Sequence, residues 1–249
     1  MDLSHWLIII PARLKSERLP RKPLSTLAGK PLIVRVFENL APLAKHGAQI
    51  VVAVDHEDTA VICSQYNVPH VMTREDHQSG TDRCHEVAQR FTKHPLILNV
   101  QGDEPFIDTN DLTALMAKME NSNFPMGTLG IRNQDWTQFQ DPNIVKIVLG
   151  HDETAIYFSR ASVPFDRETH RAGIHKADFT QHMGIYAFRR DGLERFCQLP
   201  PSTLEQTEKL EQLRAISAGW KIHVSVAKHP SLGIDTPQDL AEANRRFHG

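Results

Sequence analysis

Short apolar segments alternate with amphipathic segments along the first half of the chain. Continuous runs of Val, Ile and Leu are typical of strands that are buried on both faces, and helix-length stretches separate these runs. This alternation predicts a parallel sheet with helices on both sides. The predicted strands are Trp6–Ile10, Ile50–Val54, His70–Met72 and Leu96–Val100, and the predicted helices lie near Pro31–Leu43, Asp58–Tyr66, Thr81–Phe91 and Thr109–Glu120.

The pattern changes in the middle of the chain, where strand-like runs follow one another with few helices between them. This change predicts an antiparallel addition to the parallel sheet. One helix is then expected over Glu205–Ala218, with Gly219 as its C-terminal cap, and a last helix begins at Thr236–Pro237. The predicted strands of this half are Met126–Ile131, Ile144–Leu149, Ala155–Ser159, Met183–Phe188 and Lys221–Ala227. Because no repeat or linker interrupts the chain, we expect one continuous domain over residues 1–249.

Composition excludes several classes of partner. The 249 residues carry a net charge of −2, with 40% hydrophobic and 23% charged residues, so neither a nucleic acid nor a membrane surface is expected. The apolar run Trp6–Ile10 is far shorter than the roughly 20 residues of a membrane span. Cys63, Cys84 and Cys197 are widely spaced and odd in number, which predicts unbridged thiols and a cytoplasmic location. The 14 histidines form no HExxH or Cys/His ligand motif.

A cationic loop follows the first predicted strand. Five cations fall within ten positions, and proline keeps the loop from forming a helix: Arg13, Lys15, Arg18, Arg21 and Lys22. Ligands of open α/β sheets bind at the carboxyl ends of the strands, and Lys and Arg neutralise phosphate charge. The loop therefore predicts a polyphosphate site, although GxxxxGK[ST] and GxGxxG are both absent.

Three further motifs follow predicted strands. The segment Arg74–Arg83 places Ser79, Gly80 and Thr81 at the start of a helix, where they serve either as an ordinary cap or as contacts to a nucleotide base. Gly102 lets the chain turn so that Asp103 and Glu104 are held at a strand tip, where a carboxylate is either a turn residue or a Mg²⁺ ligand. Asp235 either caps the last helix or returns to the same edge of the sheet. A phosphate loop, two carboxylates and a base-reading segment together indicate nucleotidyl transfer.

Seven motifs resemble, in order, those of the 3-deoxy-manno-octulosonate (KDO) cytidylyltransferases. They are PAR…S.RLP.KPL, DHQSGTDR, NVQGDEP, IYFSRASVPFDR, HMGIYAF, EKLEQLR and GIDTPQDL, between Pro11 and Leu240. The resemblance implies an α/β fold, a Rossmann-like nucleotide-sugar-synthetase (nucleotide-diphospho-sugar transferase-like) mixed sheet with an antiparallel dimerisation section. It also implies Mg²⁺, a homodimer and a role in lipopolysaccharide synthesis. We expect the dimerisation and sugar-binding section at about residues 130–190.

The same resemblance implies a role for individual residues. CTP phosphates would meet Ala12, Arg13 and Lys22, the cytosine would meet Arg74, Ser79, Gly80 and Thr81, and the ribose would meet Gln101. Asp103 and Asp235 would bind Mg²⁺, and Arg13, Lys22 and Asp103 would be catalytic. The sugar acid would lie among Arg160, His182, Tyr186, Glu211 and Gln212, with Arg160 and His182 as cations for its carboxylate. Without the resemblance, Tyr186 is more typical of core or interface packing, and Glu211 and Gln212 are more typical of an exposed helix face.

The reaction implied is attack of the sugar's anomeric hydroxyl on the α-phosphorus of CTP, with release of pyrophosphate. Three alternatives stay open: transfer to a sialic acid or to 8-amino-KDO, a metal-dependent glycosyltransferase, and a catalytically inactive nucleotide-binding regulator. The family commonly has glycine where Arg21 stands, which suggests that position 21 needs no positive φ here.

Overall fold

The computed structural model describes residues 1–168 and 176–248, and the chain forms two compact units. The first unit comprises Met1–Leu112 and Pro230–Gly249, and the second comprises Thr113–His229. The domain expected from the sequence therefore consists of two compact units. The section expected at about 130–190 falls within the second unit, except that residues 169–175 lie outside the described residues.

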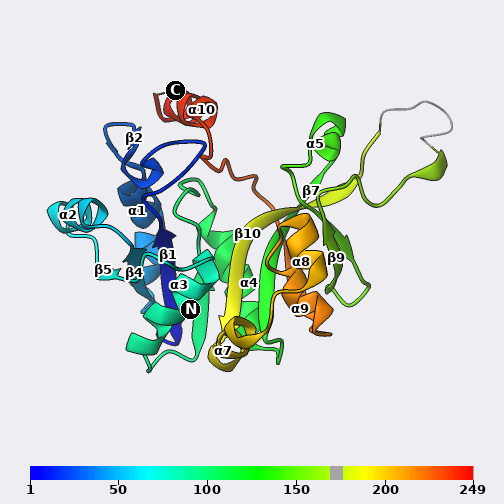
Figure 1. Ribbon diagram of the computed structural model, residues 1–249, viewed down its shortest axis with the longest axis horizontal. Helices are drawn as coiled ribbons and strands as arrows, with labels where there is room; N and C mark the ends of the chain where they lie inside the picture. The colour runs from blue at the N-terminus through cyan, green and yellow to red at the C-terminus, as the bar shows by residue number, and fades with distance from the viewer. Residues whose placement is uncertain (169–175, 249) are drawn as a thin grey trace. The chain divides into compact units, whose positions relative to one another are not determined.

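The first unit is built on four parallel strands, drawn in blue, cyan and green in Figure 1. Their order is β6-β1-β4-β5. All seven residues of β1 are buried, and burying one Val, Leu or Ile side chain contributes roughly 1.5–3 kcal/mol. The predicted parallel sheet is therefore confirmed. The strands are β1 (Trp6–Ala12), β4 (Gln49–Val54), β5 (His70–Met72) and β6 (Leu96–Asn99).

Helices pack against these strands, with α1 and α2 contacting β4 and α3 contacting β1 and β6. The chain returns at its end as α10, where the Asn244 side chain accepts a hydrogen bond of 2.9 Å from the Ala28 N–H. The elements are the 3₁₀ helix η1 (Lys22–Leu24), the hairpin β2 (Thr26–Leu27) and β3 (Lys30–Pro31), α1 (Leu32–Ala44), α2 (Glu57–Gln65), α3 (Gly80–Arg90) and α10 (Pro237–His248). Helix α4 (Thr109–Glu120) spans the division between the units.

Parallel strands place their carboxyl ends at one edge of the sheet. The turn after β6 lies close to the end of β1, because a Cβ at Gly102 would stand 2.7 Å from the Pro11 carbonyl oxygen. Only glycine fits this approach. The first unit thus brings the cationic loop and the QGDEP turn to the same edge.

The second unit is a mainly antiparallel sheet of order β11-β7-β10-β8-β9. Strand β11 pairs parallel with β7, whereas the β7–β10, β10–β8 and β8–β9 pairs are antiparallel. The predicted antiparallel section is therefore confirmed. Its strands are β7 (Met126–Asn133), β8 (Lys146–Leu149), β9 (Ala155–Ser159), β10 (Phe179–Arg189) and β11 (Ile222–Ala227), and its helices include α5 (Trp136–Gln140) and α7 (Arg190–Gln198).

The helix predicted over Glu205–Ala218 is wrong in one respect, because the structure has two short helices there. Lys209 adopts a left-handed conformation with φ of 53°, which ends α8 (Thr203–Glu208) before α9 (Leu213–Ser217) begins. The predicted cap at Gly219 is confirmed: its φ is 77°, and its N–H donates to the Ile216 carbonyl at 2.9 Å. The break places Glu211 and Gln212 in the turn between the two helices.

Candidate active site

A lysine joins two distant carboxylates in the first unit. The Lys22 ammonium donates to Asp103 Oδ2 at 2.5 Å and to Asp235 Oδ1 at 2.9 Å. Arg18 contacts the other oxygen of Asp235 at 3.0 Å. The cationic loop and both acidic motifs therefore meet at one point, as the sequence predicted.

The local backbone of the cationic loop explains where Lys22 points. Pro23 lies in the first turn of η1, and the Leu24 N–H donates to the Arg21 carbonyl at 2.9 Å. Arg21 itself has φ of 55°, so the expectation that position 21 needs no positive φ is wrong. The Arg21 guanidinium forms an exposed ion pair of 2.7 Å with Asp58.

Asp235 is not the cap of the last helix. The Asp239 carboxylate accepts from the Thr236 N–H at 2.8 Å and from the Thr236 hydroxyl at 2.8 Å, and Thr236 Oγ1 accepts from the Asp239 N–H at 3.2 Å. Because Thr236 and Asp239 perform the capping, the Asp235 carboxylate is directed to Lys22 instead. Of the two alternatives for Asp235, the structure therefore favours the return to the edge of the sheet.

Glu104 lies next to Asp103 in the turn after β6. Its Oε2 accepts from the Ser231 hydroxyl at 2.6 Å, and the neighbouring Asp103 carbonyl accepts from the Ile234 N–H at 2.8 Å. These two contacts join the turn after β6 to the segment that carries Asp235. Burial, with Asp103 nearby, raises the pKa of the Glu104 carboxyl to about 8.

Arg13 follows the end of β1, and the start of α3 lies at the same edge of the sheet. Nη2 of Arg13 is buried and has no hydrogen-bond partner among the described residues, as expected of a side chain built to meet an anion. The Ser79 hydroxyl closes a capping box with Asp82, so the cap interpretation of this segment holds for Ser79. A Cβ at Gly80 would lie 3.4 Å from Pro11 and 3.6 Å from the Gln101 side chain, which places the helix start beside the ends of β1 and β6.

The second unit contains a buried neutral cluster. The Tyr186 hydroxyl donates to Gln212 Oε1 at 2.9 Å, and Gln212 Nε2 is buried with no hydrogen-bond partner among the described residues. His182 Nε2 lies 2.9 Å from the Thr128 hydroxyl, which itself donates to the Ile185 carbonyl. His182 Nε2 is therefore the donor to Thr128, and Nδ1 is left as an acceptor.

Burial determines the charge of this cluster. It lowers the pKa of His182 to about 3 and raises the pKa of Tyr186 well above its usual value, the nearby Glu211 carboxylate adding to the second effect. The lowered pKa favours a neutral imidazole at neutral pH, in contrast to the cation expected from the sequence. Neutral donors and acceptors are suited to sugar hydroxyls rather than to a carboxylate.

Arg160 holds the turn that carries Glu211 and Gln212. Its Nε donates to the Glu208 carbonyl at 2.7 Å, and its terminal nitrogens donate to the carbonyls of Pro142 at 2.9 Å and Lys209 at 3.4 Å. Each terminal nitrogen carries a second N–H. Arg160 thus has a structural function, and N–H groups remain for an anion.

Sequence reasoning missed two residues that support Arg160. The Glu208 carboxylate accepts from the Ser159 hydroxyl at 2.7 Å and from the Arg160 N–H at 2.9 Å. The fully buried Lys146 ammonium donates to the carbonyls of Asp141, Ile144 and Arg160 at 2.7, 2.6 and 3.0 Å. The three carbonyl oxygens satisfy the buried ammonium and so explain why a lysine is buried here. The apolar pattern of a strand does not predict a buried lysine.

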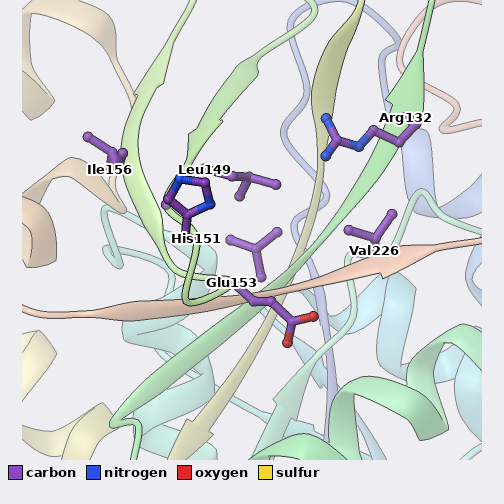
Figure 2. A pocket seen from close by; sticks show the side chains of 8 residues that line it. Arg132, Leu149, His151, Glu153, Ile156 and Val226 are labelled. Carbon is purple, nitrogen blue, oxygen red and sulfur yellow. The ribbon is translucent and has the colours of Figure 1, made fainter.

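The second unit also has a pocket of about 470 Å³ (Figure 2). Figure 2 shows Arg132, His151 and Glu153 around apolar side chains of β8, β9 and β11. None of the candidate sugar-acid residues lines it. The lining residues are Arg132, Leu149, Gly150, His151, Glu153, Ile156, Val224 and Val226.

The chain matches known cytidylyltransferases over nearly all of its length. The sequence profile of the cytidylyltransferase family matches residues 7–222. A 3-deoxy-manno-octulosonate cytidylyltransferase of Gemmatimonas aurantiaca is 42% identical over 245 residues, covering 97% of this chain and 93% of that protein. The chain belongs to the 3-deoxy-manno-octulosonate cytidylyltransferase family. The corresponding protein of Herminiimonas arsenicoxydans is 43% identical and covers 96% of this chain and 98% of its own length.

Solved structures agree with this assignment. A CMP:2-keto-3-deoxy-manno-octonic acid synthetase in complex with CTP is 36% identical, covers 98% of both chains and superposes with a TM-score of 0.89. A putative glucose-1-phosphate thymidylyltransferase of Bacillus anthracis, 16% identical with a TM-score of 0.68 over 97% of this chain and 94% of that chain, shares the fold. The expected nucleotide-sugar-synthetase fold is confirmed, and this cytidylyltransferase is neither a glycosyltransferase nor a regulator by family.

Proposed function

We propose that this cytidylyltransferase transfers CMP from CTP to the anomeric hydroxyl of 3-deoxy-D-manno-octulosonate and releases pyrophosphate, for lipopolysaccharide synthesis. The observation that carries the proposal is the meeting of Lys22, Asp103 and Asp235. The loop that carries Lys22 also carries Arg13, whose Nη2 is buried without a hydrogen-bond partner among the described residues. The test is pyrophosphate release from CTP with a panel of sugar acids. KDO should be the preferred member, and a clear preference for 8-amino-KDO or a sialic acid would replace it as substrate.

The proposed mechanism depends on positioning and charge. The sugar hydroxyl attacks the α-phosphorus while pyrophosphate leaves in line. Arg13 and Lys22 neutralise the charge that builds on the departing phosphates. Gln212 Nε2 and His182 Nδ1 orient the sugar through its hydroxyls, and the remaining N–H groups of Arg160 meet its carboxylate.

The carboxylates of Asp103 and Asp235 fit a magnesium ion. They come from different segments, yet both contact a single cation, the Lys22 ammonium, and hard carboxylate oxygens are the ligands that Mg²⁺ prefers. When bound, Mg²⁺ would supply charge neutralisation and would favour ionisation of the sugar hydroxyl. Lys22 and Arg18, released from the carboxylates, are then the cations available to phosphate oxygens. Turnover should disappear with EDTA and return with added Mg²⁺.

We propose that the Arg74 and Ser79–Thr81 segment, with Gln101, sets a preference for CTP over UTP and ATP. The Arg74 side chain is 71% exposed and lies in the same segment as the helix start at Gly80. A site that hydrogen-bonds the pyrimidine edge rejects a base that leaves those groups unpaired. Equal kcat/KM for CTP and UTP would contradict this assignment.

A homodimer and a cytoplasmic location complete the proposal. Ile156 of β9 is 57% exposed and Val226 of β11 is 47% exposed, which leaves apolar surface on the second unit for a twofold partner. A monomeric mass by light scattering at micromolar concentration would contradict the dimer.

All three cysteines lie within the described residues and are thiols, as expected for a reducing compartment. Among residues 1–168 and 176–248, no helix is long and apolar enough to cross a membrane.

A further inference from the structure

A buried ion pair between Asp55 and Arg83 contacts both segments proposed to bind CTP, the cationic loop and the segment that begins at Arg74. Arg83 of α3 is fully buried, and its Nη2 donates to Asp55 Oδ2 at 3.2 Å; the Asp55 side chain is 7% exposed. The other oxygen of Asp55 accepts from the Leu14 N–H at 2.9 Å, in the cationic loop directly after Arg13. One carboxylate therefore connects α3 to the triphosphate loop.

The same arginine also holds the base-reading segment. Arg83 Nη1 donates to the Thr73 hydroxyl and, at 3.2 Å, to the Arg74 carbonyl. Glu86, one turn further along α3, accepts from the Arg74 N–H at 3.1 Å. Both peptide groups of Arg74 are thus held by α3, while its guanidinium stays exposed.

Two arginines share this corner of the first unit. The positive charge of Arg13 lies near Arg83, and burial together with that charge lowers the pKa of the Arg83 guanidinium, while Asp55 opposes the shift. Buried ion pairs contribute little net stability, so the arrangement is better explained by what it positions than by fold stability. Asp55 supplies the negative charge that lets the two guanidinium groups lie near each other.

We propose that Asp55 and Arg83 are positioning residues that fix the triphosphate loop relative to the base-reading segment and thereby set the affinity for CTP and its preference over UTP. The proposal rests on the assignment of Arg13 and Arg74 to CTP made above. A displaced Leu14 moves Arg13, and a displaced Arg74 carbonyl moves the group that reads the base, so both parts of the nucleotide site depend on one pair.

The test compares Asp55→Asn and Arg83→Lys with a matched pair in the second unit. Asparagine is isosteric but has a single acceptor oxygen, so it cannot accept from both Arg83 and the Leu14 N–H as Asp55 does. Lysine keeps the charge of Arg83 without the planar fork. Glu205 and Arg214 form a similar ion pair, with side chains 13% and 12% exposed, so Glu205→Gln and Arg214→Lys control for loss of a buried pair. The measurements are the Kd of CTP, KM for both substrates, the CTP-to-UTP ratio of kcat/KM and the thermal midpoint.

Both variants should weaken CTP binding about tenfold, a change of roughly 1.4 kcal/mol, and lower the CTP-to-UTP ratio, while KM for the sugar acid stays within about twofold. The control variants should lose thermal stability without a change in the Kd of CTP. Wild-type CTP affinity and selectivity in a folded Asp55→Asn variant would overturn the proposal; this variant decides if Arg83→Lys does not fold.

Arg13→Ala and Arg74→Ala distinguish failure of the positioning pair from failure of the CTP-site assignment. If they lose CTP binding while Asp55→Asn does not, the site stands and the positioning pair is wrong. If they retain CTP binding, the site assignment fails and this inference fails with it.

Discussion

The cluster around Lys22 in the first unit and the cluster around Tyr186 in the second unit differ in charge and in exposure to water. In the first unit, Lys22 has a side chain 17% exposed and faces two carboxylates that are 23% and 43% exposed, so the groups are charged and accessible to water. In the second unit, Tyr186 and Gln212 are buried, His182 is half-buried, and all three side chains are neutral. A metal triphosphate carries a high charge that must enter and leave, whereas sugar hydroxyls are distinguished best by hydrogen bonds in dry surroundings. Under the proposed assignment of the two clusters, charge serves the nucleotide and hydrogen-bond geometry serves the sugar.

The largest effect is expected from the carboxylates of the charged cluster. Asp103→Asn and Asp235→Asn should each lower kcat by several orders of magnitude, on the order of 4 kcal/mol or more in the barrier at about 1.4 kcal/mol per tenfold. Because both side chains are partly exposed, the thermal midpoint should change little. Asp152→Asn, whose side chain is 50% exposed in an ion pair with Lys221, is the control and should keep its turnover. Near-normal turnover of the Asp235 variant would show that only one carboxylate matters.

The next effect tests the neutral cluster. Tyr186→Phe removes the donor to Gln212 Oε1 and leaves a buried acceptor unsatisfied, which costs about 1–3 kcal/mol. KM for the sugar acid should rise roughly tenfold through misplacement of Gln212, with KM for CTP unchanged. Tyr66→Phe alters an exposed tyrosine and serves as the control. An equal rise in both KM values would mean that the clusters are not separate in function.

How much of this was readable from the sequence differs between the clusters. The parallel strands and the approach of Lys22 to Asp103 follow from strand periodicity and from the rule that strand ends share an edge. Asp235 does not follow a strand of this parallel sheet, so the sequence left its position open until the contact with Lys22 was seen. The neutral His182 could not be predicted, because its pKa depends on burial by strands far apart in the chain.

Two backbone conformations could not be predicted from the sequence pattern either. Lys209 and Arg21 adopt positive φ without being glycine, so no residue type marked the break after α8 or the turn before η1. Both residues make contacts with distant parts of the chain: Arg160 donates to the Lys209 carbonyl, and Asp58 pairs with Arg21. Such tertiary contacts are invisible to a reading based on local propensity.

A third prediction concerns the support of the sugar cluster. Lys146→Met removes the ammonium that three carbonyls share, including that of Arg160, and should cost roughly 3 kcal/mol of stability. For a chain of this size the thermal midpoint should fall by about 6–12 °C. Lys221→Met, at a side chain 68% exposed, should shift the midpoint little. An unchanged midpoint for Lys146→Met would mean that water replaces the ammonium without loss.

The buried carboxyl of the charged cluster gives a fourth prediction. The pKa of Glu104 is raised from 4.5 to about 8, so in the absence of divalent ions its contribution to stability is complete below pH 4.5 and is lost as pH rises through 8. Between pH 5 and 7 the loss should be roughly 2.5 kcal/mol. Glu104→Gln keeps an acceptor for Ser231 and should remove this slope from urea unfolding. A slope that persists in the variant would assign it to other groups.

The neutral cluster should show the opposite pH dependence, with an effect smaller than that of Glu104. Burial lowers the pKa of His182 from 6.5 to about 3, so the folded state resists protonation, and stability that is complete above pH 6.5 is lost as pH falls towards 3. Between pH 7 and 5 the loss should be roughly 2 kcal/mol. His182→Asn should flatten this part of the urea-unfolding profile, whereas the exposed His151→Asn should not. If His182→Asn instead steepens the loss at low pH, the histidine is protonated in the folded protein and the second cluster is charged after all. That result would remove the distinction between the two clusters and restore His182 as a cation for the sugar carboxylate.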